Sequence, residues 1–223
     1  TAISADNTTL TINFNEDVFS DFDGLTDVAL NNFGLSSSGG VATVSASSIN
    51  IISGTQVDIT LGITGVPDGT ETVTVEPSAT IYDGAGNPMD FPQSNNVVTL
   101  NDEKEPILSG LSIGTITNND VDMYIEVDET STLYYVLTQS MDQPTFQQIL
   151  DGQDEFGSPA ISADSYAIIG FTGNTYPISG LDPSTTYYVY WAAEDAAGNR
   201  SSILSDNFIT ADPPVDLTFS TVA

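Results

Sequence analysis

The chain has 223 residues, of which 31 are acidic and only two, Lys104 and Arg200, are basic, so its formal net charge is -29. It contains no histidine and no cysteine, which removes the usual proton shuttle, thiolate nucleophiles and thiolate metal sites. Clustered Lys and Arg are needed to hold phosphate groups, so this composition excludes nucleic acid as a partner. No apolar run in the sequence approaches the ~20 residues of a membrane span, and we expect no direct insertion into a membrane.

Short β-prone runs, separated by turn residues, fill the first hundred residues. Alternation of apolar and polar residues predicts strands at residues 10–14, 57–61, 72–75 and 96–100. Turn-forming residues predict loops at residues 36–40, 67–69 and 83–88. Because no helical periodicity interrupts the series, this block is predicted to form a β-sandwich.

A charged segment that ends in proline, Asn101–Pro106, follows the first block and indicates a domain boundary. We therefore assign residues 1–101 to one domain and residues 102–212 to a second. Residues 213–223 are expected to be a linker or the start of a further module. The chain opens on Thr1 without methionine, and we expect it to be a piece of a longer protein.

The second block repeats the strand pattern and adds one helix. Strands are predicted at residues 122–127, 132–137 and 187–193. The helix is expected to place Pro144 in its first turn after Asp142, to share one face among Phe146, Ile149 and Leu150, and to end at Gly152.

Two short motifs resemble each other across the boundary. Asp83-Gly-Ala-Gly-Asn87 and Asp195-Ala-Ala-Gly-Asn199 share the pattern Asp-x-Ala-Gly-Asn, and each precedes the last predicted strand of its block. A shared loop at equivalent positions indicates two related sandwiches in tandem.

The second block resembles a fibronectin type III module. Leu181-x-Pro183-x-Thr185-x-Tyr187, followed by Val189 and Trp191, is similar to the tyrosine corner of that family and the strand after it. The stretch from Gln139 to Gly170 is longer than a minimal module of this type needs.

The first block is similar to bacterial Ig-like modules, through Thr9–Phe14, Glu16–Val18, Asn32–Phe33 and Ile81–Asn87. Together the two resemblances imply an all-β fold of two tandem sandwiches, one Ig-like and one fibronectin type III-like. They also imply a large bacterial protein that is extracellular or attached to the cell surface.

Carboxylates and amides from separate segments are expected to gather at one end of each sandwich. In the second block these are Asp128, Glu129, Asp195 and Asn199, with Asp102 and Glu103 of the linker, and in the first block they are Glu16, Asp17, Asp83 and Asn87. Ca²⁺ takes 6–8 such oxygen ligands, so calcium is a candidate cofactor. The alternative interpretation of each Asp-x-Ala-Gly-Asn loop is a metal-free turn in which Asp accepts hydrogen bonds from the loop backbone.

An aromatic strand, Tyr187–Trp191, gives a second candidate surface. Alternation directs Tyr187, Val189 and Trp191 to one face, where we expect a core, and Tyr188 and Tyr190 to the other. The outer tyrosines are expected either to stack on sugar rings or to be cross-strand neighbours of Tyr134 and Tyr135.

Two carboxylates suffice for glycoside hydrolysis, but no candidate acid lies in a context that marks catalysis. The acids considered are Glu16, Glu71, Glu76, Glu126, Glu129 and Glu194. We predict a non-catalytic spacer, stalk or adhesin module, whose partners are neighbouring domains of the same polypeptide, and glycans or a cell surface. The alternative is a carbohydrate-binding accessory module of an extracellular polysaccharide-degrading enzyme, for which an exposed aromatic platform would be the distinguishing feature.

Overall fold

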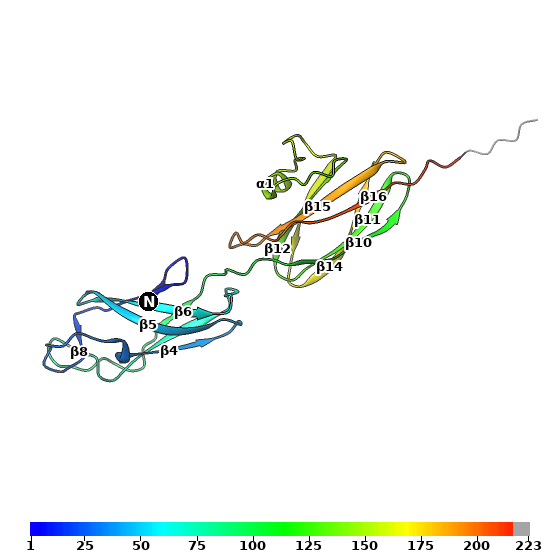
Figure 1. The fold of residues 1–223 in the computed structure, drawn as a ribbon. Helices are drawn as coiled ribbons and strands as arrows, with labels where there is room; N and C mark the ends of the chain where they lie inside the picture. Colours follow the sequence, from blue (N-terminus) through cyan, green and yellow to red (C-terminus); the bar gives the residue numbers. More distant parts are fainter. Residues whose placement is uncertain (216–223) are drawn as a thin grey trace, which may run out of the picture. The chain divides into compact units, whose positions relative to one another are not determined.

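A computed structural model describes residues 1–215 of the chain, and β-strands make up most of its regular structure (Figure 1). The chain divides into two compact units, Thr1–Lys104 and Glu105–Ala223, and the division falls inside the charged segment Asn101–Pro106. The prediction made for residues 216–223 lies outside the described residues. Among residues 1–215, no helix is both long and apolar enough to cross a membrane.

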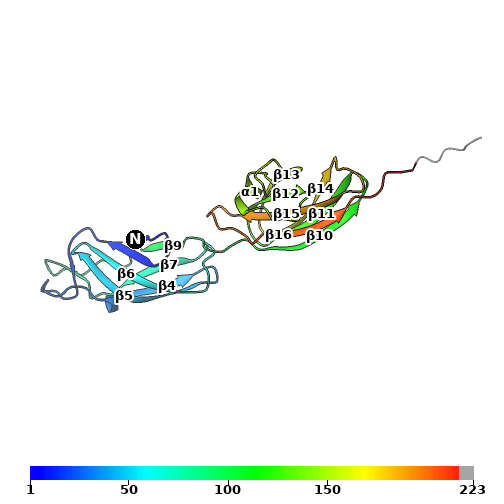
Figure 2. The ribbon, with the colours of Figure 1, turned by 45° about the horizontal axis from the view of Figure 1, so that its top comes forward.

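Unit 1 is a sandwich of two antiparallel sheets (Figures 1 and 2). One sheet has the order β1-β2-β6-β5, and the other has the order β4-β7-β9. Their bounds are β1 Ala2–Ile3, β2 Thr9–Asn13, β4 Phe33–Ser38, β5 Thr43–Ser53, β6 Gln56–Thr64, β7 Thr72–Pro77 and β9 Val97–Thr99. Lettered A to G in chain order without the short ribbon, these are the A-B-E-D and C-F-G sheets of a constant-type immunoglobulin sandwich.

Two small elements complete unit 1. A ribbon formed by β3 (Val18–Phe19) and β8 (Tyr82–Asp83) lies beside the sandwich, and a 3-10 turn, η1, spans Leu30–Asn32. The three serines expected in a turn at 36–40 are instead the end of β4, and only Gly39 and Gly40 make the turn. Serine is accepted in β4 because the strand alternates buried and exposed positions and places Ser36 and Ser38 outside.

The alternating residues of unit 1 meet in one core between its sheets. Val57, Ile59 and Leu61 of β6 are buried, as are Leu10 and Ile12 of its neighbour β2. Removing these side chains from water stabilises the unit, at about 1.5–3 kcal/mol for each large aliphatic residue.

Unit 2 is a second sandwich with three strands facing four. The three-stranded sheet has the order β10-β11-β14, and the four-stranded sheet has the order β13-β12-β15-β16. The bounds are β10 Leu108–Ile116, β11 Asp120–Val127, β12 Ser131–Thr138, β13 Ser162–Ile168, β14 Thr172–Ser179, β15 Thr186–Glu194 and β16 Leu204–Ile209. In the same lettering these are A-B-E and C′-C-F-G, the division expected from the resemblance to fibronectin type III modules.

The aromatic strand β15 supplies the centre of the unit 2 core. Trp191 is fully buried, and its ring centroid lies 5.0 Å from that of Tyr135 and 5.4 Å from that of Tyr176. The hydroxyl of Tyr187 accepts a hydrogen bond of 2.9 Å from the backbone N–H of Asp182. The predicted tyrosine corner and the predicted core position of Trp191 are therefore confirmed.

The long stretch after β12 forms an insertion that covers the outer face of the four-stranded sheet. It contains α1, Phe146–Leu150, whose N-cap is Thr145. The side chain of Thr145 accepts from the backbone N–H of Gln148, and the side chain of Gln148 accepts from that of Thr145. The helix was predicted, but its start was placed too early, because this reciprocal capping begins the helix after Pro144.

The insertion changes the environment of the outer tyrosines. Ile149 of α1 packs with Tyr190, Val136 and Ala192 in a separate buried cluster, and Tyr190 is only 3% exposed. An exposed platform of Tyr188 and Tyr190 is therefore absent from this face, because the helix and its loops cover it. The alternative, in which these tyrosines are cross-strand neighbours of Tyr134, is confirmed: all three pack in this cluster, although Tyr190 lies directly across from Val136 and Tyr188 from Thr138. Tyr135 instead faces the inner core.

Candidate functional site

The loop around Asp195 is a closed turn. Oδ1 of Asp195 accepts hydrogen bonds from the backbone N–H groups of Ala197 (2.8 Å) and Asn199 (2.9 Å), and Oδ2 accepts one of 2.8 Å from the Asn199 side-chain amide. Gly198 has a positive φ of 91°, a conformation that glycine adopts without steric cost. The motif residues are thus needed for the turn itself.

The loop around Asp83 is built in the same way. Its Oδ1 accepts from the N–H groups of Ala85 and Asn87, each at 2.8 Å, and its Oδ2 accepts from the Asn87 side-chain amide at 2.7 Å. The hydrogen bond from the Asn87 side chain, followed by those from the backbone, holds the pKa of Asp83 below its ordinary value. One loop lies between β7 and β9 and the other between β15 and β16, so the repeated motif occupies equivalent positions in the two units.

The remaining predicted ligands of unit 1 are placed as follows. Glu16 and Asp17 lie between β2 and β3, where Asp17 stands against the backbone of Gly54. In the segment that leaves the unit, Asp102 accepts from the backbone N–H of Lys104 at 3.0 Å, and Glu103 accepts from the side-chain amide of Asn7 at 2.9 Å. Of the ten predicted ligands, the structure brings Glu16, Asp83 and Asn87 together around one cavity.

In unit 2, Asp128 and Glu129 lie in the connection between β11 and β12. A carboxylate oxygen of Asp128 accepts from the backbone N–H of Ile107 at 2.7 Å. Within residues 1–215, no group of three or more acidic side chains has an arrangement that could hold a metal ion. Calcium binding stays a prediction, and at Asp195 a cation would have to displace the amide donor of Asn199 from Oδ2.

A buried carboxylate that the sequence gave no reason to single out anchors one turn of unit 1. Glu71 is fully buried, and its Oε1 accepts from the backbone N–H groups of Val41 and Ala42, both at 2.9 Å. Its Oε2 accepts from the N–H of Asp68 at 3.0 Å. A Cβ atom on Gly40 would lie 2.0 Å from Oε1 of Glu71, so glycine is required there and this acid is structural.

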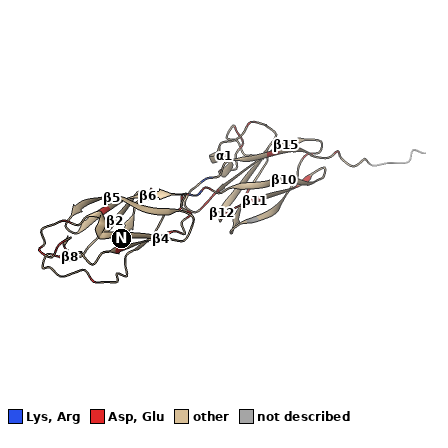
Figure 3. Ribbon diagram, turned by 60° about the horizontal axis from the view of Figure 1, so that its bottom comes forward, with Lys and Arg blue, Asp and Glu red and all other residues tan. Residues whose placement is uncertain are grey.

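Two other acids considered for catalysis also have partners. Glu194 lies 2.6 Å from the Nε of Arg200, whose guanidinium stands 4.8 Å from the ring centroid of Phe146. Glu126 accepts a hydrogen bond of 2.7 Å from the hydroxyl of Tyr124, which raises the pKa of that tyrosine. Arg200 thus connects the end of β15 to the insertion. Figure 3 colours Lys and Arg blue and the acidic residues red.

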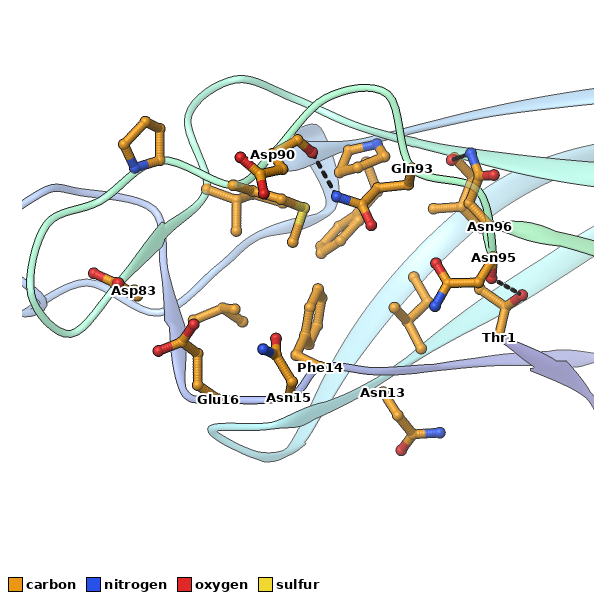
Figure 4. Close-up of a pocket in the computed structure, with 18 of the residues that line it drawn as sticks. Thr1, Asn13, Phe14, Asn15, Glu16, Asp83, Asp90, Gln93, Asn95 and Asn96 are labelled. Atoms are coloured by element: carbon orange, nitrogen blue, oxygen red, sulfur yellow. Dashed lines mark hydrogen bonds between the residues drawn. The ribbon is translucent and has the colours of Figure 1, made fainter.

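A cavity of about 700 Å³ opens at one end of unit 1 (Figure 4). Its wall includes Phe14 just after β2, Phe33 at the start of β4, and the segment that follows β8. The ring centroids of the two phenylalanines lie 6.3 Å apart. Sequence reasoning missed this cavity, and the available signal was the length of the proline-containing stretch between Asp83 and Asn96.

The cavity exists because the last strand of unit 1 is short. Strand β9 pairs only with Thr72–Thr74 of β7. Beyond that point, Asn96 takes the place of a paired strand beside Val75 of β7. Its side-chain amide donates to the Val75 carbonyl at 2.7 Å, and its backbone carbonyl accepts from the Val75 N–H at 2.8 Å. The chain from Gly84 to Asn95 therefore leaves the sheet edge and contributes to the wall of a space between the sheets.

Comparison with known proteins assigns the chain to no family. No protein-family model matches the chain, and no curated protein matches it. Among solved structures, the crystal structure of the chicken CNTN1 FN1-FN3 domains is similar at 12% sequence identity and a TM-score of 0.35. The alignment covers 92% of this chain and 64% of that one, so the chain spans less than two thirds of that structure.

Proposed function

We propose that the chain is a non-catalytic spacer segment of a larger extracellular or cell-surface protein of bacteria. The observation that carries this proposal is the way each unit fixes the segment leaving it. In both units, two connections bind the segment that follows the last strand. One is the turn between strands A and B (β1–β2 in unit 1, β10–β11 in unit 2), and the other is the loop between strands E and F (β6–β7 and β14–β15). A spacer needs such fixed ends because a free end would leave the neighbouring domain unoriented.

In unit 1 the fixing residue is Asn7, which is fully buried in the turn between β1 and β2. Its side chain accepts from the N–H of Asn101 at 2.8 Å and donates to the carbonyl of the same residue at 2.9 Å. The N–H of Glu103 donates to the carbonyl of Pro67, in the loop between β6 and β7, at 2.9 Å. The chain is therefore held for several residues beyond its last strand.

In unit 2 the corresponding contacts are made by Ala211 and Asp212. The N–H of Ala211 donates to the carbonyl of Thr117 between β10 and β11 at 2.9 Å, and the hydroxyl of Ser184 donates to Asp212 at 2.7 Å. The segment entering this unit is held at the other end of β11, where Ile107 and Asp128 exchange two hydrogen bonds. The chain thus enters unit 2 at one end and leaves it at the opposite end, as a module in a series requires.

Backbone dynamics test the proposal directly. In the full chain, ¹⁵N relaxation should give Glu103 and Ala211 order parameters of about 0.85, the value of rigid backbone. Asn7→Ala should lower the value at Glu103, and Asn50→Ala, an exposed change on β5, should leave it unchanged. Values below about 0.6 in the unaltered protein, or polysaccharide hydrolysis that is lost on a single Glu-to-Gln change, would contradict the spacer function.

A further inference from the structure

The cavity of unit 1 has the size and composition of a ligand site. Its volume of about 700 Å³ lies in the range of small-molecule pockets, roughly 300–1,000 Å³. Its wall combines the rings of Phe14 and Phe33 with side-chain amides and carboxylates, and it includes neither of the two basic residues of the chain. A site of this kind does not attract phosphate, sulfate or carboxylate ligands, because Glu16, Asp83 and Asp90 would repel them.

Several polar groups of the wall are not used within the protein. The side chains of Asn15, Glu16 and Asn95 are exposed and make no hydrogen bond within the described residues. Figure 4 shows Asn15 and Glu16 beside Phe14 on one side of the space, Gln93 on the facing side, and the Asn95 amide directed inward. Each amide offers both donors and an acceptor, and the carboxylate offers acceptors only.

Two exposed aromatic rings belong to segments that adjoin the cavity wall without lining the cavity. Phe91 is 76% exposed, next to Pro92 of the wall, and Phe22 is 66% exposed. The segment of Phe22 is held against the loop that precedes the wall, since a Cβ on Gly86 would lie 2.7 Å from the Phe22 carbonyl oxygen. The aromatic surface of the cavity itself is supplied by Phe14, Phe33 and Tyr82 of its wall, which offer apolar faces to a ligand.

We propose that this cavity, bounded by Phe14, Asn15, Glu16, Gln93 and Asn95, binds a sugar residue of a neutral glycan. The hydroxyls of a sugar both donate and accept, as the amides and the carboxylate do, and the C–H face of its ring is apolar, as the phenylalanine ring is. The carboxylates of the wall, together with the absence of Lys and Arg side chains from it, select neutral glycans over uronic acid and sulfated ones. This binding role goes beyond the spacer function and does not depend on it.

The test uses the full chain and four probes: cellotetraose, mannotetraose and chitotetraose as neutral glycans, and tetragalacturonic acid as an anionic one. Isothermal titration calorimetry should detect at least one neutral probe and not the anionic one. The double variant Asn15→Ala/Asn95→Ala should weaken that binding about tenfold or more, the effect of losing two neutral hydrogen bonds. Its melting temperature should be unchanged, since neither side chain bonds within the protein.

Asn50→Ala, an exposed amide change on β5 outside the cavity, is the matched control and should retain full affinity. The side-chain amide NMR signals of Asn15, Gln93 and Asn95 should shift with the neutral probe. The proposal is overturned if no neutral probe binds at millimolar concentration, or if the double variant binds as tightly as the control. It is also overturned if calcium chloride, and none of the glycans, moves these amide signals.

Discussion

Removal of the Glu71 carboxylate should destabilise unit 1 and leave unit 2 unaffected. Glu71→Ala deprives three backbone N–H groups of their acceptor, those of Val41, Ala42 and Asp68. The N–H of Ala42 is buried, and an unsatisfied buried donor costs about 1–3 kcal/mol. The other two are partly buried and can recruit water, at roughly 0.5–1 kcal/mol each. The expected loss is therefore about 2–5 kcal/mol, a large part of the roughly 5–15 kcal/mol that stabilises a typical domain.

Graded variants separate the carboxylate's hydrogen bonds from its volume. Glu71→Gln keeps the shape but directs an NH₂ group at one of the three donors, so we expect a smaller loss of about 1–3 kcal/mol. Gly40→Ala should destabilise unit 1 through the same hydrogen bonds, because its Cβ would collide with Oε1 of Glu71. Glu76→Gln, a change at an exposed acid of strand β7, which begins directly after Glu71, is the control and should stay within about 0.5 kcal/mol of the unaltered protein.

The single tryptophan makes the assay specific for each unit. Trp191 lies in the core of unit 2, so its fluorescence reports the urea unfolding of that unit, whereas far-UV circular dichroism reports both. Glu71→Ala should move part of the dichroism transition to lower urea and leave the fluorescence midpoint in place. A fluorescence midpoint that moves with it would refute the independence of the two cores, and no change in either signal would refute the anchoring role of Glu71.

Three further changes test the turns and the insertion. Tyr187→Phe should cost roughly 0.5–1 kcal/mol of unit 2 stability, because the partly buried Asp182 N–H loses its acceptor and must recruit water, and the fluorescence midpoint in urea would reveal this. Ile149→Ala should cost about 2–5 kcal/mol in the same assay, unless the insertion contributes nothing to the stability of unit 2. Asp195→Ala should lower the melting temperature equally in calcium and in EDTA if the loop is only a turn, whereas a loss seen in calcium alone would establish the cation. The hydrogen bonds of Ser4 and Thr8 lower the pKa of Asp6 to about 2. The stabilisation that the ionised Asp6 carboxylate provides is therefore complete above pH ~4 and is lost as the pH falls through ~2. The ¹³C NMR signal of this carboxyl group in an acid titration would show the pKa directly.

The strands of the core could be predicted because alternation in them is set by burial on one face. The structure has strands at Thr9–Asn13, Gln56–Thr64 and Asp120–Val127. The predicted strands at 10–14, 57–61 and 122–127 lie inside these strands or extend at most one residue beyond them. Strand β5 was missed because its inner positions are small or only half-buried, so Thr43–Ser53 lacks a clear apolar repeat. Its conformation is decided by pairing with β6, to which a short turn at Gly54–Thr55 joins it.

The site was harder to predict than the fold, because the same residue type serves several purposes. Asp195 and Asp83 fitted both a cation and a metal-free turn in the sequence, and their oxygens accept the hydrogen bonds of their own loops. The anchoring role of Glu71 depends on a turn some 30 residues earlier in the chain, at Gly39–Gly40, and no local pattern records that contact. The cavity depends on where β9 stops pairing, which is a property of the assembled sheet.

The hydrogen bonds that hold the segments entering and leaving unit 2 determine what happens when the protein is pulled from its ends. A tensile force applied to the chain reaches the pair between Ile107 and Asp128 and the bond from Ala211 to Thr117 before it reaches the strands. We expect these contacts to rupture first, and the seven strands behind them to stay folded until a larger barrier is crossed. Lifetimes under tension are set by rupture rates and not by the equilibrium free energy. Asp128→Ala should therefore shorten the time for which the entering segment stays attached under load, while the lifetime of the strands and the melting temperature hardly change.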